Sequence, residues 1–109
     1  MQRDLPFLLV RATPLPDARA TFDRWFREVH LRDARRVPGF KSVEASLTRD
    51  GAFIGIYTLA DPDTVQEALG SPEAMYARGA WEQWASRLRE LVVEMYAPLP
   101  PMRVFEHRN

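Results

Sequence analysis

One segment of the sequence, from Phe22 to Phe40, combines an amphipathic helical pattern with an abrupt stop. Its apolar residues recur at spacings of three and four, which places them on one helix face: Phe22, Trp25, Phe26 and Val29. Asp17 is a candidate N-cap, and we expect the helix to end before Pro38 because proline lacks an amide hydrogen. The segment therefore predicts a helix whose aromatic face packs against another layer, with His30 at the edge of that face.

Two alternating segments, Phe40–Thr48 and Phe53–Leu59, flank the dipeptide Asp50-Gly51. Such a dipeptide is typical of a two-residue β-hairpin turn, because both central residues of that turn need positive φ. In this register the numbers of paired residues sum to 101, so we expect Glu44 opposite Tyr57. One face of the hairpin would carry Ser42, Glu44, Ser46, Phe53, Gly55 and Tyr57, and the other Val43, Ala45, Leu47, Ile54 and Ile56.

The remaining elements complete an alternating order. Phe7–Thr13 reads as a strand between two prolines, and Asp61-Pro62 starts a short helix over Asp63–Leu69. A second long helix starts at Ser71-Pro72, and Leu91–Ala97 reads as the last strand. The helical stripe expected on this long helix is Trp81, Trp84, Ala85, Leu88, Leu91 and Val92. The order strand, helix, strand, strand, helix, strand predicts the α+β ferredoxin-like fold, βαββαβ, with a four-stranded antiparallel sheet.

Composition limits the class of protein. With 109 residues we expect one domain, residues 1–109, in which 98–109 form a C-terminal tail. Fifteen basic residues balance fifteen acidic ones, which argues against nucleic acid as a partner. We find neither an apolar run long enough to span a membrane nor a signal peptide, and expect a cytoplasmic protein without membrane association.

Metals and cofactors are not expected. The chain has no cysteine and two histidines, His30 and His107, which lie too far apart in sequence to form a recognisable metal-ligand set. Glycine-rich phosphate loops and nucleophile elbows are also absent from the sequence. As for partners, the hairpin has large apolar residues on both faces, so we expect a second copy to cover the sheet in a homodimer.

Three stretches carry a family resemblance: WFREVHLRDARRVPGF at 25–40, IGIYTL at 54–59 and SPE at 71–73. With them the chain resembles the EthD-like branch of the dimeric α+β barrel proteins, from about Phe22 to Met75. The positions that match are Trp25, His30, Pro38, Gly39 and Tyr57. Where the common pattern has proline two residues after the histidine, this chain has Arg32, a cation expected near the pocket mouth. The resemblance implies a pocket between sheet and helices for a small hydrophobic or aromatic molecule.

Three residues are candidates for catalysis. His30 can give or take a proton near neutral pH, although a histidine at a helix end is as often a capping or surface residue. Glu44 beside Tyr57 could orient the phenol or act as a base, and a solvated cross-strand pair is the alternative. The small residues around that pair would leave room for a ligand.

The expected substrate-binding residues are mostly aromatic, and about two of the five aromatic residues Trp25, Trp81, Trp84, Tyr76 and Phe53 should touch the cavity. The full set is Trp25, Phe26, Arg11, Ser46, Phe53, Tyr76, Trp81 and Trp84. With the resemblance, they predict a cofactor-independent lyase, isomerase or cyclase that acts by proton transfer on a lactone, aromatic or polyketide-like substrate. The alternatives are a cofactor-free monooxygenase of quinol-type aromatics and a non-catalytic small-molecule-binding protein.

Overall fold

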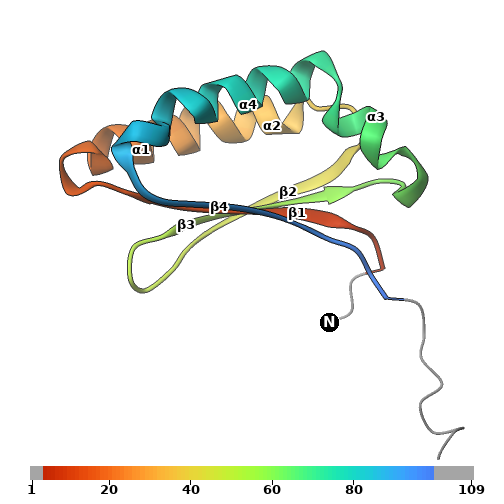
Figure 1. Ribbon diagram of the computed structural model, residues 1–109, viewed down its shortest axis with the longest axis horizontal. Helices are drawn as coiled ribbons and strands as arrows, with labels where there is room; N and C mark the ends of the chain where they lie inside the picture. Colours follow the sequence, from red (N-terminus) through yellow and green to blue (C-terminus); the bar gives the residue numbers. More distant parts are fainter. Residues whose placement is uncertain (1–3, 100–109) are drawn as a thin grey trace, which may run out of the picture.

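The computed structural model describes residues 4–99. One antiparallel sheet has the strand order β2-β3-β1-β4. Its strands are β1 (Phe7–Pro14), β2 (Phe40–Leu47), β3 (Phe53–Leu59) and β4 (Leu88–Tyr96). The helices are α1 (Arg19–Trp25), α2 (Leu31–Arg35), α3 (Val65–Leu69) and α4 (Pro72–Trp84). All of them cover one face of the sheet and leave the other open (Figure 1), which confirms the ferredoxin-like α+β fold.

The first helical region begins with a 3-10 turn instead of a side-chain cap, and it ends where the sequence predicts. A short 3-10 turn at Pro16–Ala18 precedes α1, and Asp17 lies exposed inside this turn, so the prediction that Asp17 caps the helix is wrong. Proline at the first turn needs no amide partner, which explains why the turn starts there. The stop before Pro38 is confirmed, because α2 ends at Arg35.

A π-helical turn at Phe26–His30 joins α1 to α2. Buried residues recur at every fourth position along this region: Ala18, Phe22, Phe26, His30 and Ala34. In a regular α-helix of 3.6 residues per turn, a spacing of four drifts about 40° around the axis at each step. The wider turn absorbs part of this drift, because the amide of Leu31 donates to the carbonyl of Phe26 five residues earlier. The π turn thus keeps His30 on the face that looks to the sheet.

The hairpin between β2 and β3 has a three-residue turn, so the predicted register is wrong by one residue. The amide of Thr48 donates to the carbonyl of Ala52, and Gly51 adopts φ +92°. This is the turn in which a left-handed glycine follows a type I turn. Paired numbers therefore sum to 100, as for Val43 with Tyr57 and for Glu44 with Ile56.

The change of register exchanges residues between the two predicted faces of the hairpin. Residues that pair across two strands share a face of the sheet, and successive residues of one strand alternate between the two faces. A shift of one residue in the pairing therefore changes which residues of β2 and β3 share a face. Phe53 and Tyr57 are buried beneath the helices, whereas Glu44 is exposed on the open face. The helix side carries Val43, Ala45, Leu47, Phe53, Gly55 and Tyr57, and the open side carries Ser42, Glu44, Ser46, Ile54, Ile56 and Thr58.

The second long helix, α4, is shorter than predicted. It gives way to a 3-10 turn at Ala85–Arg87, and Leu88 and Leu91 already belong to β4. Leu88 pairs with Pro14 of β1 and Leu91 pairs with Ala12, and a bulge in β4 separates the two leucines. A bulge adds a residue to one strand, so residues three apart reach the same side of the sheet and imitate helical spacing.

The core lies where α1 and α4 meet the sheet. Phe22 is fully buried and packs with the rings of Phe26, Phe53, Trp81 and Trp84. A second cluster of Val10, Ala34 and Tyr57 continues toward α2. Within residues 4–99 we find no helix with the length and apolar character needed to cross a membrane.

Candidate functional site

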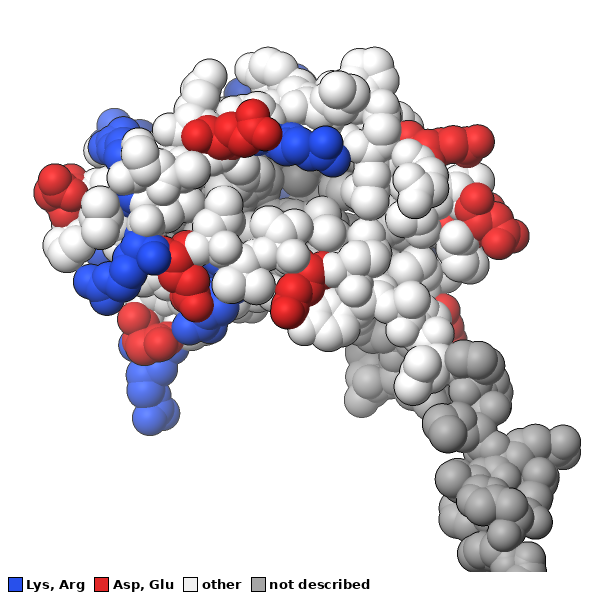
Figure 2. Space-filling view, viewed as in Figure 1, with Lys and Arg blue, Asp and Glu red and all other residues white. Residues whose placement is uncertain are grey.

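A cavity of about 410 Å³ lies between the helices and the sheet. Its volume is in the range of small-molecule sites. On the surface, Figure 2 shows a hollow between helices and sheet whose walls are mostly uncharged. The lining comes from all four strands, from the helices α2, α3 and α4 and from the turns next to them: Leu8, Val10, His30, Ala34, Val37, Phe40, Tyr57, Leu69, Ala74, Ala77, Arg78, Trp81, Glu82, Ala85, Leu91 and Val93.

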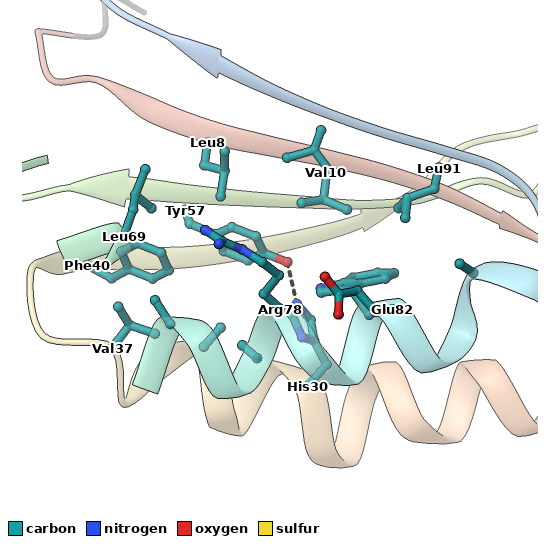
Figure 3. A pocket seen from close by; sticks show the side chains of 16 residues that line it. Leu8, Val10, His30, Val37, Phe40, Tyr57, Leu69, Arg78, Glu82 and Leu91 are labelled. Atoms are coloured by element: carbon teal, nitrogen blue, oxygen red, sulfur yellow. Dashed lines mark hydrogen bonds between the residues drawn. The ribbon is translucent and has the colours of Figure 1, made fainter. Parts of the chain in front are cut away.

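His30 and Tyr57 meet at the wall of this cavity. A hydrogen bond of 2.5 Å joins His30 Nε2 and Tyr57 Oη, as Figure 3 shows. The π turn positions His30, and the alternation of β3 points Tyr57 toward the helices. The two residues are 3% and 2% exposed, so the pair is shielded from bulk water.

Burial determines the protonation states of this pair. Desolvation lowers the pKa of His30 to about 4, and the charge of the Asp33 carboxylate opposes that shift. The rings of Trp25, Phe26 and Trp81 pack against the imidazole and help to keep water away from it. Burial also raises the pKa of the Tyr57 hydroxyl. At neutral pH the imidazole is therefore uncharged and the phenol keeps its proton.

Gly55 and Phe40 position the tyrosine ring. The Phe40 ring stacks on the Tyr57 ring at 5.6 Å between centroids, with the planes 3° apart. The phenol lies back along its own strand, over Gly55, and a Cβ at residue 55 would be only 2.2 Å from Tyr57 Oη. The sequence suggested that small residues near Tyr57 leave room for a ligand, but at Gly55 that room is filled by the phenol itself.

Three of the polar residues predicted for the site lie elsewhere. Glu44 and Ser46 belong to the open face of β2, and the residue between them in sequence faces the helices. The expected Glu44–Tyr57 pair therefore does not form. Ser46 instead lines a smaller cavity of about 210 Å³ next to Phe26 and Phe53. Arg11 is on the open face as well, paired with Asp50 at 3.3 Å and with Glu90 at 3.1 Å.

The aromatic candidates divide between core and surface. Trp81 lines the cavity of about 410 Å³, whereas Tyr76 is 69% exposed on α4 and does not. The others belong to the aromatic core under the helices: Trp25, Phe26, Phe53 and Trp84. Of the five aromatic residues from which we expected about two contacts, only Trp81 reaches this cavity, because Trp25, Trp84 and Phe53 pack in the core and Tyr76 faces solvent.

Arg78, Glu82 and Asp33 are features of the site that the sequence reading missed. Arg78 and Glu82 lie one turn apart on α4 and line the cavity, on the same helix stripe as Trp81. Asp33 is buried one turn after His30 and pairs with Arg32 at 3.5 Å. The spacing His-x-x-Asp on one helix was the available signal for Asp33. Arg32 itself was expected near the pocket mouth and does not line the cavity.

Residues 4–99 contain no group of three or more His, Asp or Glu side chains placed to hold a metal ion. The polar groups of the cavity, namely an imidazole, a phenol, a guanidinium and a carboxylate, can donate, accept and transfer protons. The chemistry open to this arrangement is therefore acid–base chemistry on a ligand held in an apolar environment.

Comparison with known proteins supports the fold. No protein-family profile and no curated protein sequence matches this chain. Among solved structures, Rv0793 from Mycobacterium tuberculosis superposes with a TM-score of 0.68 at 23% identity, over 88% of this chain and 96% of its own. An EthD family protein from Bacillus halodurans gives 0.70 at 16% identity, over 87% of this chain and 100% of its own.

A third similar structure is SnoaB from Streptomyces nogalater, a cofactor-independent oxygenase, with a TM-score of 0.63 at 20% identity, over 93% of this chain and 99% of its own. At these identities the likeness concerns the fold, and it agrees with the resemblance indicated by the sequence. This chain therefore has the ferredoxin-like α+β fold shared by EthD-type proteins and by structures described as antibiotic biosynthesis monooxygenases.

Proposed function

We propose that this protein is a cofactor-independent enzyme that moves a proton on a small cyclic or aromatic carbonyl compound, in an isomerisation, dehydration or cyclisation. The observation that carries the proposal is the 2.5 Å hydrogen bond between His30 Nε2 and Tyr57 Oη at the wall of the apolar cavity. General acid–base catalysis needs a proton-carrying group within hydrogen-bond reach of a bound ligand, and a dry site strengthens its interactions.

In the proposed reaction the pair acts as a relay. Tyr57 donates its hydroxyl hydrogen to the neutral His30 Nε2. As Tyr57 Oη takes a proton from a ligand carbon next to a carbonyl group, the proton of Tyr57 passes to His30, which leaves an enolate and an imidazolium. The Asp33 carboxylate favours that imidazolium. The proton then returns by the same route to another atom of the ligand, and the two side chains regain their starting forms.

Hydrogen–deuterium exchange tests this proposal without knowledge of the natural substrate. Two-ring ketones such as 1-tetralone and 2-tetralone are incubated with the protein in D₂O, and exchange of their α-hydrogens is followed by NMR. We expect the protein to accelerate exchange, and His30→Gln to reduce that acceleration by about two orders of magnitude or more. Tyr57→Phe should have a similar effect, because it removes the atom that meets the ligand.

Circular dichroism and chromatographic elution establish that the variants are folded. Exchange that is unaffected by His30→Gln in a folded variant would remove His30 from the mechanism. No acceleration by the unmodified protein, despite measurable binding of these ketones, would instead favour the role of a non-catalytic small-molecule-binding protein.

A second candidate is oxygen insertion into a quinol-type aromatic compound without a cofactor. It is favoured by the fold shared with SnoaB, a cofactor-independent oxygenase, and by a cavity lined mostly by apolar side chains. An oxygen electrode separates the candidates, since oxygen uptake during turnover of an anthrone or a naphthoquinol supports the oxygenase. Proton transfer alone consumes no oxygen.

We also propose that two copies associate through the open face of the sheet. That face carries partly buried apolar residues from three strands: Leu9, Ile54, Ile56 and Val92. An uncovered sheet face with such residues favours association. Ile54→Glu should convert a dimer into a monomer in light scattering, while Gln66→Glu, the same added charge on the exposed side of α3, should leave the dimer intact. A monomeric unmodified protein would contradict the proposal.

A further inference from the structure

We infer that the cavity selects ligands that carry an acidic group, with their apolar ring system inside and a carboxylate at the rim beside Arg78. This inference rests on the proposed function, because it names the ligand class of the same site. Among residues 4–99, Arg78 is the only arginine or lysine that lines the cavity.

The face of α4 that looks into the cavity is made of small residues next to long charged ones. Ala74 and Ala77 leave space on that face, and Arg78 follows directly at its edge. Figure 3 shows the Arg78 side chain extending from α4 toward the sheet, alongside the cavity. A ligand in the space beside the alanines would therefore end close to a guanidinium group.

The charge of this guanidinium is available to a ligand. Within residues 4–99, neither Arg78 nor Glu82 takes part in an ion pair, although the two are spaced i,i+4 on one helix. The other described residues of the lining are uncharged at neutral pH, because burial keeps His30 neutral and Tyr57 protonated. A carboxylate is the group that a guanidinium fork binds best, with two parallel hydrogen bonds.

Glu82 restricts where the carboxylate of a bound ligand can lie. Its carboxylate lies one turn nearer the C-terminal end of α4 and repels an anion placed there. An acidic ligand is thus oriented with its charged group toward Arg78 and with the carbon next to its neutral carbonyl toward Tyr57 Oη. A ligand with a ketone at one end and a carboxylate at the other matches both.

The test uses 6-carboxy-1-tetralone and its methyl ester, which share the ring system and the ketone and differ in charge. Binding is measured by calorimetry, or by quenching of tryptophan fluorescence because Trp81 lines the cavity. For the unmodified protein we expect the acid to bind about tenfold more tightly than the ester, as for a charge-assisted hydrogen bond at a partly exposed site. Added salt should reduce that preference.

Two variants at the rim serve as opposite controls. Arg78→Gln should remove the preference for the acid, because it weakens binding of the acid far more than binding of the ester. Glu82→Gln keeps the size of the side chain and removes the competing negative charge, so it should tighten binding of the acid. Equal affinities of acid and ester for the unmodified protein, an unchanged preference in Arg78→Gln, or no binding of either compound would overturn the inference.

The two proposals fail in distinguishable ways. If the acid is preferred but its α-hydrogens do not exchange, the ligand class stands and the proton-transfer function is lost. If neutral tetralones exchange in a manner that depends on His30 while acid and ester bind equally, the function stands and the role of Arg78 is lost.

Discussion

The hydroxyl of Tyr57 occupies the space that a side chain at residue 55 would need. A Cβ built on Gly55 lies 2.2 Å from Tyr57 Oη and 2.6 Å from Tyr57 Cζ, far inside van der Waals contact. The same hydroxyl forms the hydrogen bond to His30. The absence of a side chain at residue 55 thus allows the phenol to lie along the sheet and reach the imidazole.

Gly55→Ala should therefore separate Tyr57 from His30. The added methyl group displaces the ring, and we expect loss of at least 90% of any activity that depends on the pair, together with a lower melting temperature. The ¹⁵N chemical shifts of the His30 ring report the hydrogen bond directly and should match those of Tyr57→Phe. The matched control is Gly79→Ala, since a Cβ at that position in α4 meets nothing within 4 Å.

The control should behave in the opposite way. Alanine is more favourable than glycine inside a helix by about 0.8–1.0 kcal/mol, so Gly79→Ala should raise the stability and leave the His30 shifts unchanged. An intact His30–Tyr57 signal in Gly55→Ala would show that the ring has another way to reach the imidazole.

The buried imidazole should make the protein less stable in mild acid. The folded-state pKa of His30 is about 4, below the ordinary value of 6.5 that applies to the unfolded chain. As the pH falls below 6.5, the unfolded state binds a proton that the native state cannot accept until about pH 4. The free energy of unfolding should therefore fall across this window by about 3 kcal/mol.

Comparison with His30→Gln isolates this contribution, because the two proteins differ in no other ionisable group. The difference in unfolding free energy between the two, measured by urea denaturation at pH 7, 6, 5 and 4.5, should shrink or reverse as the pH falls. A difference that stays constant from pH 7 to 4.5 would mean that the imidazole is protonated in the native state at an ordinary pH.

The aromatic core should tolerate truncation poorly at its centre. Phe22 is fully buried and its ring lies within 6 Å of five other aromatic rings, measured between centroids. Phe22→Ala leaves a cavity and loses these contacts, which typically costs about 3–5 kcal/mol. Tyr76→Ala removes an aromatic ring that is 69% exposed and should change the unfolding free energy by less than about 0.5 kcal/mol. Denaturant titration of both variants checks the contrast.

The sequence predicted the order of elements well, because the signals involved are local. The aromatic stripe around Phe22, the stop before Pro38 and the caps at Asp61 and Ser71 depend only on nearby residues. His30 and Tyr57 were also recognised, each on its own element. What the sequence did not provide was their direct contact, since it depends on a π turn in one element and on a missing side chain in the other.

The wrong predictions arose where one additional residue, in a turn or in a bulge, changes which side chains share a face of the sheet. The Asp50-Gly51 pair fits both a two-residue and a three-residue turn, and choosing the former placed Glu44 next to Tyr57. In the same way, the bulge in β4 gave Leu88 and Leu91 a helical spacing. Both cases need pairing with a neighbouring strand to be resolved, and a local pattern does not contain that information.

The turn at Gly51 offers a last test of the register on which the site depends. Gly51 has φ +92°, where residues with a side chain are strained, and a Cβ there would lie 3.0 Å from Arg19 Nη2. Arg19 in turn donates from Nη1 to the carbonyl oxygen of Gly51 and fixes the loop to α1. Gly51→Ala should therefore lower the unfolding free energy by about 1–2 kcal/mol, the cost of a left-handed conformation for alanine.

Gly51→Asn should cost less, because asparagine tolerates this conformation while adding the same Cβ. The difference between the two variants therefore measures the backbone requirement alone. Equal destabilisation by both would mean that contact with Arg19, rather than the left-handed turn, accounts for the need for glycine at this position.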